Sequence, residues 1–430
     1  MKKLFSLLLA ATMTFSLTLP ALADHYTYSE PEKSTMMPRS TPETHGMSSQ
    51  YILDLLDAFD YADAEVHNIL MAIDGEVVFE GHYAPYTALD PHIMFSGTKI
   101  FTNAAVGVAV TEGYLHLDDY VYDVLKDYVT QDVSELQSKV QLKHLLTMTS
   151  GVDRFMSGSE LRPLTTSWIE HILTEPIVHE PGTYYLYSSG NTMLSSAMVT
   201  VATGKTCLEL LNTTGFCEEL GIKNFTWDMS PDGFNAGHGG IKITAEDLAK
   251  VGQLYMNGGV WNGKQILSKE WCDLAIGYEK TVENQGDYAY HWTAYEDGLY
   301  YTATGSYGQT LAICPKLNMV IAIQAGTKQN IGELLYQNIF KPYGDALDAG
   351  TVPEPDDALS AALAKRAENL NLMFTTDFTA SPIGELVDDV TFTAAENQYG
   401  ITTLSLDVHD DYIDYTMTDA RGTHTIRNGI

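Results

Sequence analysis

Lysine and arginine are scarce in this chain, which carries 24 of them against 56 aspartates and glutamates. The resulting formal net charge of −32 at pH 7 is spread along the sequence and forms no acidic tail. Such a surface repels nucleic acids and anionic lipids, so neither is expected as a partner. The charge therefore predicts a well-solvated surface and no particular chemistry.

Cysteine is also rare, and its four positions are Cys207, Cys217, Cys272 and Cys314. They form no CxxC pair and no cysteine–histidine cluster with zinc spacing, so no metal centre is expected. Buried free thiols are the favoured interpretation. An oxidising compartment would also permit a disulfide between Cys207 and Cys217.

Long apolar runs are missing beyond the first 23 residues, so no later segment is expected to span a bilayer. Residues 1–23 have two lysines before a leucine-rich run, and they end in the small-x-small pattern Ala21-Leu22-Ala23. A membrane anchor is the alternative, but the run is short and interrupted by serine and threonine. We therefore expect a signal peptide over 1–23 and an exported protein, whether secreted, periplasmic or at the cell surface.

Strand-like segments lie on both sides of a long helical region. Residues 69–72 and 77–79 flank the turn signal Asp74-Gly75, residues 115 to 220 have mostly helical patterns, and four strand-like runs follow between 288 and 326. There is no alternation of strand and helix and no internal repeat. The pattern predicts an α+β fold, in which helices flank an antiparallel β-sheet and a large helical insertion separates its strands.

The chain divides into a main part over residues 24–348 and a smaller part over 349–430. The second part begins with the proline-containing stretch "DAGTVPEPDD", which is typical of a linker, followed by an amphipathic helix pattern. After it, alternation places Leu404, Leu406 and Val408 on one face of a strand. We expect a linker, a helix and a small β-rich C-terminal extension without obvious chemistry.

Most catalytic motifs are absent, including G-x-S-x-G and HExxH, and "ATGKT" at 202–206 lacks the upstream glycine of a phosphate-binding loop. Ser96-Gly97-Thr98-Lys99, the only Ser-x-x-Lys, opens an apolar helix. Residues three apart share a helix face, so Lys99 can reach the Ser96 hydroxyl. Desolvation lowers the pKa of an amine, which can then accept the proton of a serine nucleophile. The alternative is a helix-capping serine beside a lysine that extends to solvent.

Two later segments could complete such a site. The stretch "EPGTYYLYSSGN" places Tyr187 before a helix, and a tyrosine near a lysine can relay protons. The stretch "ATGSYGQTLAICP" at 303–315 has glycines inside a strand, which suggests close approach of another backbone or a ligand. Its backbone N–H groups could complete an oxyanion hole with that of Ser96. Core aromatic residues and a simple β-bulge are the alternatives.

In this order, the three segments resemble the motifs of the serine β-lactamase and penicillin-binding protein superfamily, and within it the class C β-lactamase-like hydrolases. The resemblance extends over residues 50 to 340 and includes "HLLTMTSGV" and "GGIKITAEDLAKVGQLYMNGG". The "YSSGN" step and a glycine strand that ends in glutamine are more similar to the esterase and 6-aminohexanoate-dimer-hydrolase-like members than to true β-lactamases.

The resemblance assigns roles to individual residues. It implies that Ser96 is the acylated nucleophile, Lys99 its base and Tyr187 the proton relay to the leaving group. Ser189 occupies the third position of the second motif, where many members have asparagine. A serine there can still donate a hydrogen bond, but with a shorter reach.

The third motif is expected at Ser306-Tyr307-Gly308, with the backbone N–H of Gln309 as the second oxyanion donor. The lysine that many members carry in this motif is missing here. Its absence weakens binding of the carboxylate present in β-lactams and D-Ala-D-Ala peptides. This departure from the family pattern makes β-lactamase activity a less favoured expectation.

Together these observations predict an exported serine hydrolase that cleaves a small ester, amide or peptide through a Ser96 acyl-enzyme, without metal or organic cofactor. One alternative is a β-lactamase or D-Ala-D-Ala-type peptidase acting on cell-wall-like substrates. Another is a penicillin-binding or sensing module that does not hydrolyse its ligand.

Overall fold

The computed structural model describes residues 35–223, 225–277, 282–351, 353–372, 384–397, 400–409, 412–419 and 422–429. The expected signal peptide lies outside these residues. None of the described helices is both long and apolar enough to cross a membrane. The four cysteines are buried free thiols, which is the favoured interpretation of the sequence.

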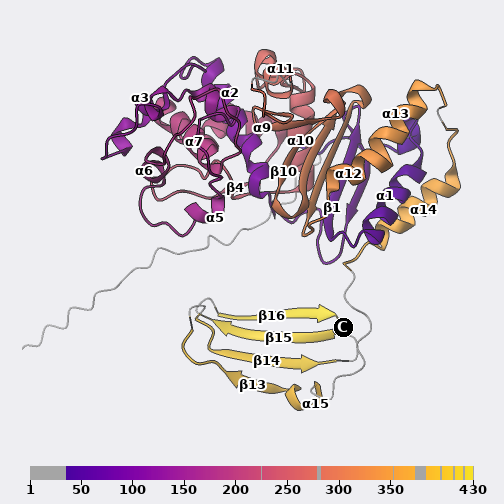
Figure 1. The fold of residues 1–430 in the computed structure, drawn as a ribbon. Coiled ribbons are helices and arrows are strands. Elements are labelled where there is room, and N and C mark those ends of the chain that lie inside the picture. Colours follow the sequence, from indigo (N-terminus) through magenta and orange to yellow (C-terminus); the bar gives the residue numbers. More distant parts are fainter. Residues whose placement is uncertain are drawn as a thin grey trace, which may run out of the picture.

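A seven-stranded antiparallel sheet with the order β2-β1-β12-β11-β10-β9-β8 forms the centre of the fold (Figure 1). Its strands are β1 (Val66–Ile73), β2 (Glu76–His82), β8 (Tyr288–Ala289), β9 (Trp292–Tyr295), β10 (Tyr300–Gly305), β11 (Gln309–Cys314) and β12 (Met319–Ala325). Strand β1 pairs with β12, about 250 residues later in the sequence, so the sheet is assembled from both ends of the domain as predicted. Asp74 and Gly75 have positive φ angles in the β1–β2 turn, as a tight hairpin requires.

Strand β1 is buried along its whole length because helices cover both faces of the sheet. Leu70 and Ala72 belong to the core on one face, and Ile69, Met71 and Ile73 to the core on the other. The second face packs against α1 (Ser49–Tyr61), α12 (Ile331–Leu335), the π-helical turn η9 (Tyr336–Phe340), α13 (Lys341–Asp348) and α14 (Asp357–Glu368). The helix α14 thus belongs to the main domain and not to the C-terminal extension.

The helical insertion covers the other face of the sheet (Figure 1). It contains α2 (Lys99–Thr111), α3 (Val121–Leu125), α4 (Leu142–Leu146), α5 (Gly158–Leu161), α6 (Trp168–Leu173), α7 (Ser189–Thr203), α8 (Cys207–Thr213), α9 (Phe216–Leu220), α10 (Ala245–Met256) and α11 (Lys269–Ile276). Thr244 caps α10 by accepting a hydrogen bond from the Asp247 N–H. Gly252 lets α10 lie directly on the sheet, since a Cβ there would meet Leu311 and Val320 at 2.8 Å.

Two small sheets complete the insertion. One joins β3 (His92–Ile93), β5 (Ile241–Ile243) and β4 (Thr226–Trp227), and the other pairs β6 (Val260–Trp261) with β7 (Lys264–Gln265). The expected C-terminal extension contains α15 (Gly384–Val387) and a separate antiparallel sheet of β13 (Val390–Thr393), β14 (Thr403–Val408), β15 (Tyr412–Asp419) and β16 (Gly422–Gly429).

Candidate active site

A cavity of about 410 Å³ lies where the sheet edge meets the helical insertion. Side chains from three distant parts of the chain converge on it. Its lining residues are Ser96, Lys99, Tyr185, Tyr187, Tyr288, His291, Thr293, Thr304, Gly305 and Ser306. The structure therefore brings the three segments singled out in the sequence to one place.

Ser96 lies in a strained turn directly before α2. The short helix η3 (Phe95–Thr98) begins at Phe95, whose φ of 44° is unusual for a bulky residue. The Gly97 N–H donates to the Met94 carbonyl at 2.8 Å, and the Met94 N–H donates to Ile241 of β5 at 2.9 Å. Strain held by surrounding contacts in this way is characteristic of functional sites.

Lys99 is the first residue of α2, and it is only 2% exposed. Its Nζ donates to the His238 carbonyl at 3.2 Å and lies 4.9 Å from the centroid of the Tyr187 ring. The neighbouring Thr102 hydroxyl donates to the Gly237 carbonyl at 2.8 Å, which holds α2 against the same loop. Lys99 therefore points into the protein, beside the cavity, and does not extend to solvent.

Tyr187 is half-buried in the irregular segment before α7. The Leu186 N–H donates to the Met148 carbonyl at 2.9 Å, and the Ser188 N–H contacts the Met148 sulfur at 3.4 Å. Met148 itself has a φ of 57°, so a second strained residue supports the site. The Tyr187 ring packs edge-on against Tyr288, with centroids 5.6 Å apart.

Burial affects the other ionisable groups of the cavity wall in opposite directions. It raises the pKa of Tyr185 to about 12 and that of Tyr288 well above its usual value, and both tyrosines stay protonated near neutral pH. It lowers the pKa of His291 to about 3, with a smaller contribution from Lys99, and this imidazole stays neutral. The wall around Ser96 and Lys99 is therefore polar, aromatic and uncharged.

Ser189, the predicted third position of the second motif, is the first residue of α7 and is buried. Its N–H donates to the Met156 carbonyl at 2.9 Å. It is not among the residues that line the cavity, unlike Tyr187 two positions earlier.

The end of β10 touches the nucleophile turn. A Cβ on Gly305 would lie 2.0 Å from the Met94 carbonyl oxygen and 3.1 Å from the Gly97 nitrogen, so only glycine permits this approach. Thr304 and Ser306 line the cavity on either side of it. Residues 304–306 are thus the strand residues beside Ser96. Of the predicted third motif, Ser306-Tyr307-Gly308, only Ser306 belongs to this group.

Tyr307 and Gly308 of the predicted third motif, and Gln309 after it, are not among the residues that line the cavity. Tyr307 is 52% exposed and contacts the Phe95 ring, with centroids 5.4 Å apart. Gly308 packs on Thr327, and Gln309 is buried with its side-chain amide donating to the Ala325 carbonyl. Gln309, whose backbone N–H is the predicted second oxyanion donor, is not among the residues that line the cavity, whereas Ser306 is.

Two buried histidines near Lys99 were not singled out by the sequence analysis as site residues. His291 lines the cavity, and no local motif marks it. His238 lies against Trp168 with ring centroids 5.8 Å apart, and burial lowers its pKa to about 3. Within the described residues, neither ring nitrogen of His238 has a hydrogen-bond partner.

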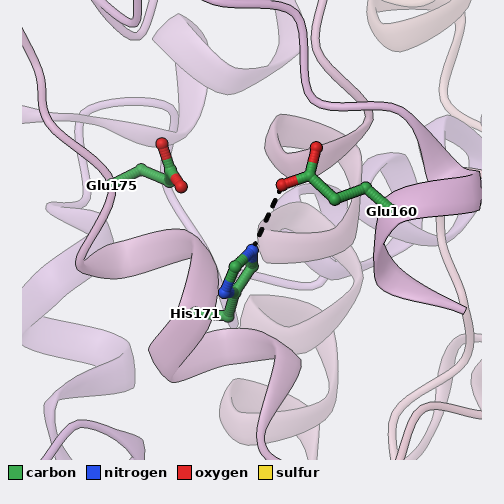
Figure 2. Close-up of side chains that lie close together, drawn as sticks. All are labelled: Glu160, His171 and Glu175. Carbon is green, nitrogen blue, oxygen red and sulfur yellow. Dashed lines mark hydrogen bonds and ion pairs between the residues drawn. The ribbon is translucent and has the colours of Figure 1, made fainter. Parts of the chain in front are cut away.

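A group that could hold a metal ion lies elsewhere in the insertion. Figure 2 shows Glu160, His171 and Glu175 facing a common space, with His171 Nε2 3.4 Å from a Glu160 oxygen. Arg154 already donates to both carboxylates through its guanidinium. An ion would compete with Arg154 for the same oxygens, so we interpret this group as a surface salt-bridge network.

Comparison with known proteins identifies the family. The profile of the family described as Beta-lactamase matches residues 68–340, which is more than half of the chain. The chain belongs to the β-lactamase family. A 6-aminohexanoate-dimer hydrolase from Paenarthrobacter ureafaciens is 24% identical over 274 residues, which cover 57% of this chain and 69% of that protein.

Solved structures share the fold of this β-lactamase family member. A candidate 6-aminohexanoate-dimer hydrolase from Bacillus anthracis has a TM-score of 0.60 at 21% identity, covering 73% of this chain and 88% of the other. A family VIII carboxylesterase has a TM-score of 0.54 at 14% identity, covering 71% and 99%. These findings confirm the α+β class and the predicted resemblance, and they place the chain in a family of serine hydrolases.

Proposed function

We propose that this member of the β-lactamase family is an exported serine hydrolase that cleaves an ester or amide bond through an acyl-enzyme on Ser96. The observation that carries the proposal is the convergence of Ser96, buried Lys99 and Tyr187 on one cavity. A buried amine beside a serine at a strained helix start supplies the base that a serine nucleophile needs. The alternative of a solvent-seeking lysine does not agree with the burial of Lys99.

In the proposed reaction, Lys99 and Tyr187 take the proton from Ser96 as its oxygen bonds to the carbonyl carbon. The N–H groups of Ser96 and Ser306 stabilise the oxyanion, since Gly305 brings the two backbones into contact. The bond to the leaving alcohol or amine then breaks, and Tyr187 passes a proton to it. Water attacks the resulting ester, and the proton returns to Ser96 as the acid is released.

The cavity favours a substrate that is uncharged near the scissile bond. Lys99 is the one cationic side chain among its lining residues, and its Nζ already bonds to the His238 carbonyl. Three tyrosine rings line the wall, and one of them, Tyr187, stacks on the exposed ring of Phe155. Aromatic surfaces of this kind bind apolar groups. A β-lactam or D-Ala-D-Ala peptide would bring a carboxylate without a matching cation.

A fluorophosphonate probe tests the nucleophile directly, because it labels only an activated serine. We expect labelling of the wild-type protein, no labelling of Ser96→Ala and unchanged labelling of Ser159→Ala, an exposed serine on α5. Labelling that persists in Ser96→Ala would overturn the proposal. Labelling without turnover would favour the non-hydrolytic penicillin-binding alternative.

A chromogenic panel tests the substrate class. It contains short neutral esters, a linear amide, a cephalosporin and a D-Ala-D-Ala peptide. We expect turnover of the esters or the amide to exceed that of the two carboxylate-bearing compounds. The opposite order would favour the β-lactamase or peptidase alternative.

Export is proposed from residues 1–23 alone. Expression of the full chain in a secreting bacterial host, followed by mass spectrometry of the mature protein, tests it. We expect a mature N-terminus at Asp24. An intact N-terminus on cytoplasmic protein would contradict this expectation.

A further inference from the structure

The two residues of the turn between β8 and β9 have backbone conformations that are unfavourable for large side chains. Ala289 pairs with Trp292, so the turn consists of Tyr290 and His291 alone. Their φ angles are 48° and 73°, the pattern of a type I′ turn, in which Asn-Gly is strongly preferred. Two large side chains are thus held in the left-handed region, and the surrounding structure must compensate for the strain.

The catalytic helix α2 provides that compensation. His291 Nδ1 lies 3.0 Å from the Lys99 carbonyl oxygen, and the Asn103 side-chain amide donates to the Tyr290 carbonyl at 2.8 Å. Lys99 and Asn103 are one helical turn apart, so both turn residues are fastened to the same face of α2. The Asn103 oxygen is itself fixed, because it accepts hydrogen bonds from Tyr255 at 2.5 Å and from Trp271 at 3.0 Å.

The contacts of His291 determine its protonation. A carbonyl only accepts hydrogen bonds, so Nδ1 carries the hydrogen and donates it to Lys99. The ring is buried and neutral, and Nε2 then has a lone pair 3.5 Å from the Thr192 hydroxyl of α7. His291 therefore links α2, which carries Lys99, to α7, which follows Tyr187, without adding a charge beside Lys99.

We propose that His291 is a positioning residue of this catalytic centre, whose Nδ1–H bond to the Lys99 carbonyl holds the first turn of α2 in register with the cavity. The inference rests on the proposed hydrolase function. A turn needed only to connect two strands would form more readily with asparagine and glycine. The imidazole lines the cavity, so His291 contributes a side chain to the site that a glycine in the turn would lack.

Two substitutions separate positioning from simple structure. His291→Gly removes the imidazole but accepts a positive φ, so the turn should still form. His291→Asn tolerates the left-handed region and retains an amide donor that can approach the Lys99 carbonyl. Asn262→Gly is the matched control, because Asn262 has a φ of 48° in the β6–β7 turn and does not line the cavity.

The measurements are the rate of fluorophosphonate labelling, the kcat and KM for a neutral ester, and the melting temperature. In labelling, the Ser96 oxygen bonds to phosphorus, fluoride leaves and the serine proton passes to the base. For His291→Gly we expect relief of the turn strain to offset only part of the cost of the cavity, so the melting temperature should fall modestly. Labelling per folded molecule and kcat should be lower by about ten- to a hundredfold, with nearly unchanged KM. His291→Asn should recover part of the rate, and Asn262→Gly should match the wild type.

The possible failures are distinguishable. A wild-type protein that is not labelled at Ser96 overturns the proposed function and this inference together. A labelled wild type with an equally fast His291→Gly variant overturns only the role of His291. The same conclusion follows if His291→Gly loses rate only in proportion to its loss of folded protein, or if His291→Asn is no faster than His291→Gly.

Discussion

Lys250 and Lys99, both in the main domain, are almost completely buried, in contrasting surroundings. Lys250 on α10 is 1% exposed, and its Nζ donates to the Asp247 carboxylate one turn away at 2.8 Å. Lys99 on α2 is 2% exposed, but its Nζ meets a neutral carbonyl and an aromatic ring, and no ion pair with it is found among the described residues. A buried lysine with a carboxylate partner contributes to structure, whereas one beside a cavity and without such a partner can act on a substrate.

The largest effect is expected from removing the amine of Lys99. Lys99→Met keeps most of the apolar stem, so the domain should fold, while the proton acceptor of Ser96 is lost. We expect the labelling rate and kcat/KM to fall by about a hundred- to ten-thousandfold. Equal activity of Lys99→Met and wild type would refute the contrast between the two lysines.

The complementary change at Lys250 should affect stability and leave chemistry intact. Lys250→Met leaves Asp247 buried without its partner, and burial already raises the pKa of this carboxyl. Breaking a buried pair in this way costs about 3 kcal/mol or more, measurable by urea denaturation. Adding Asp247→Asn should recover much of that loss, because no buried charge remains. The labelling rate per folded molecule should stay at the wild-type value in both variants.

The sequence predicted well whatever depends on neighbours along the chain. The turn at Asp74-Gly75 and the position of Ser96 and Lys99 on one cavity each follow from residues within four positions of one another. The family resemblance then placed Tyr187 beside them. These features depend on residues close together in the sequence, so they can be predicted without a structure.

Contacts between segments that are distant in the sequence could not be predicted from local sequence patterns. Gly305 lies against the Met94 carbonyl although the two residues are over 200 positions apart in the sequence. Because of this contact, residues 304–306 line the cavity. His291 occupies a turn whose sequence lacks the usual asparagine and glycine, so no turn signal pointed to it. Similarly, α14 appeared to belong to the extension until the packing of Leu363 placed it in the main core.

Two further buried groups, both histidines, are neutral in the folded protein. His238 and His291 have pKa values lowered to about 3 by burial, against an ordinary value of 6.5. Between these values the unfolded chain binds protons that the folded protein excludes, so stability falls as the pH is lowered. The free energy of unfolding should decrease by about 1.4 kcal/mol per pH unit for each histidine below pH 6.5.

Urea denaturation between neutral pH and about pH 4 measures this loss. Carboxylates also titrate in the lower part of this range, so the decisive comparison is between wild type and His238→Gln. The variant removes one titrating group and should show a shallower decline. Identical slopes for the two proteins would mean that His238 is protonated in the folded state.

The smallest effect is expected at the exposed counterpart of the buried pairs. Arg154 joins Glu160 and Glu175 at the surface, and its hydrogen bonds lower the pKa of Glu160. Water and salt screen such a network, so Arg154→Met should reduce the free energy of unfolding by only about 1 kcal/mol or less. The reduction should shrink further at high ionic strength, where the wild-type network is already weakened. If Arg154→Met lowered the free energy of unfolding as much as Lys250→Met does, the exposed ion pairs of Arg154 would be as strong as the buried pair of Lys250 and Asp247. Burial would then not explain the difference between the two sites.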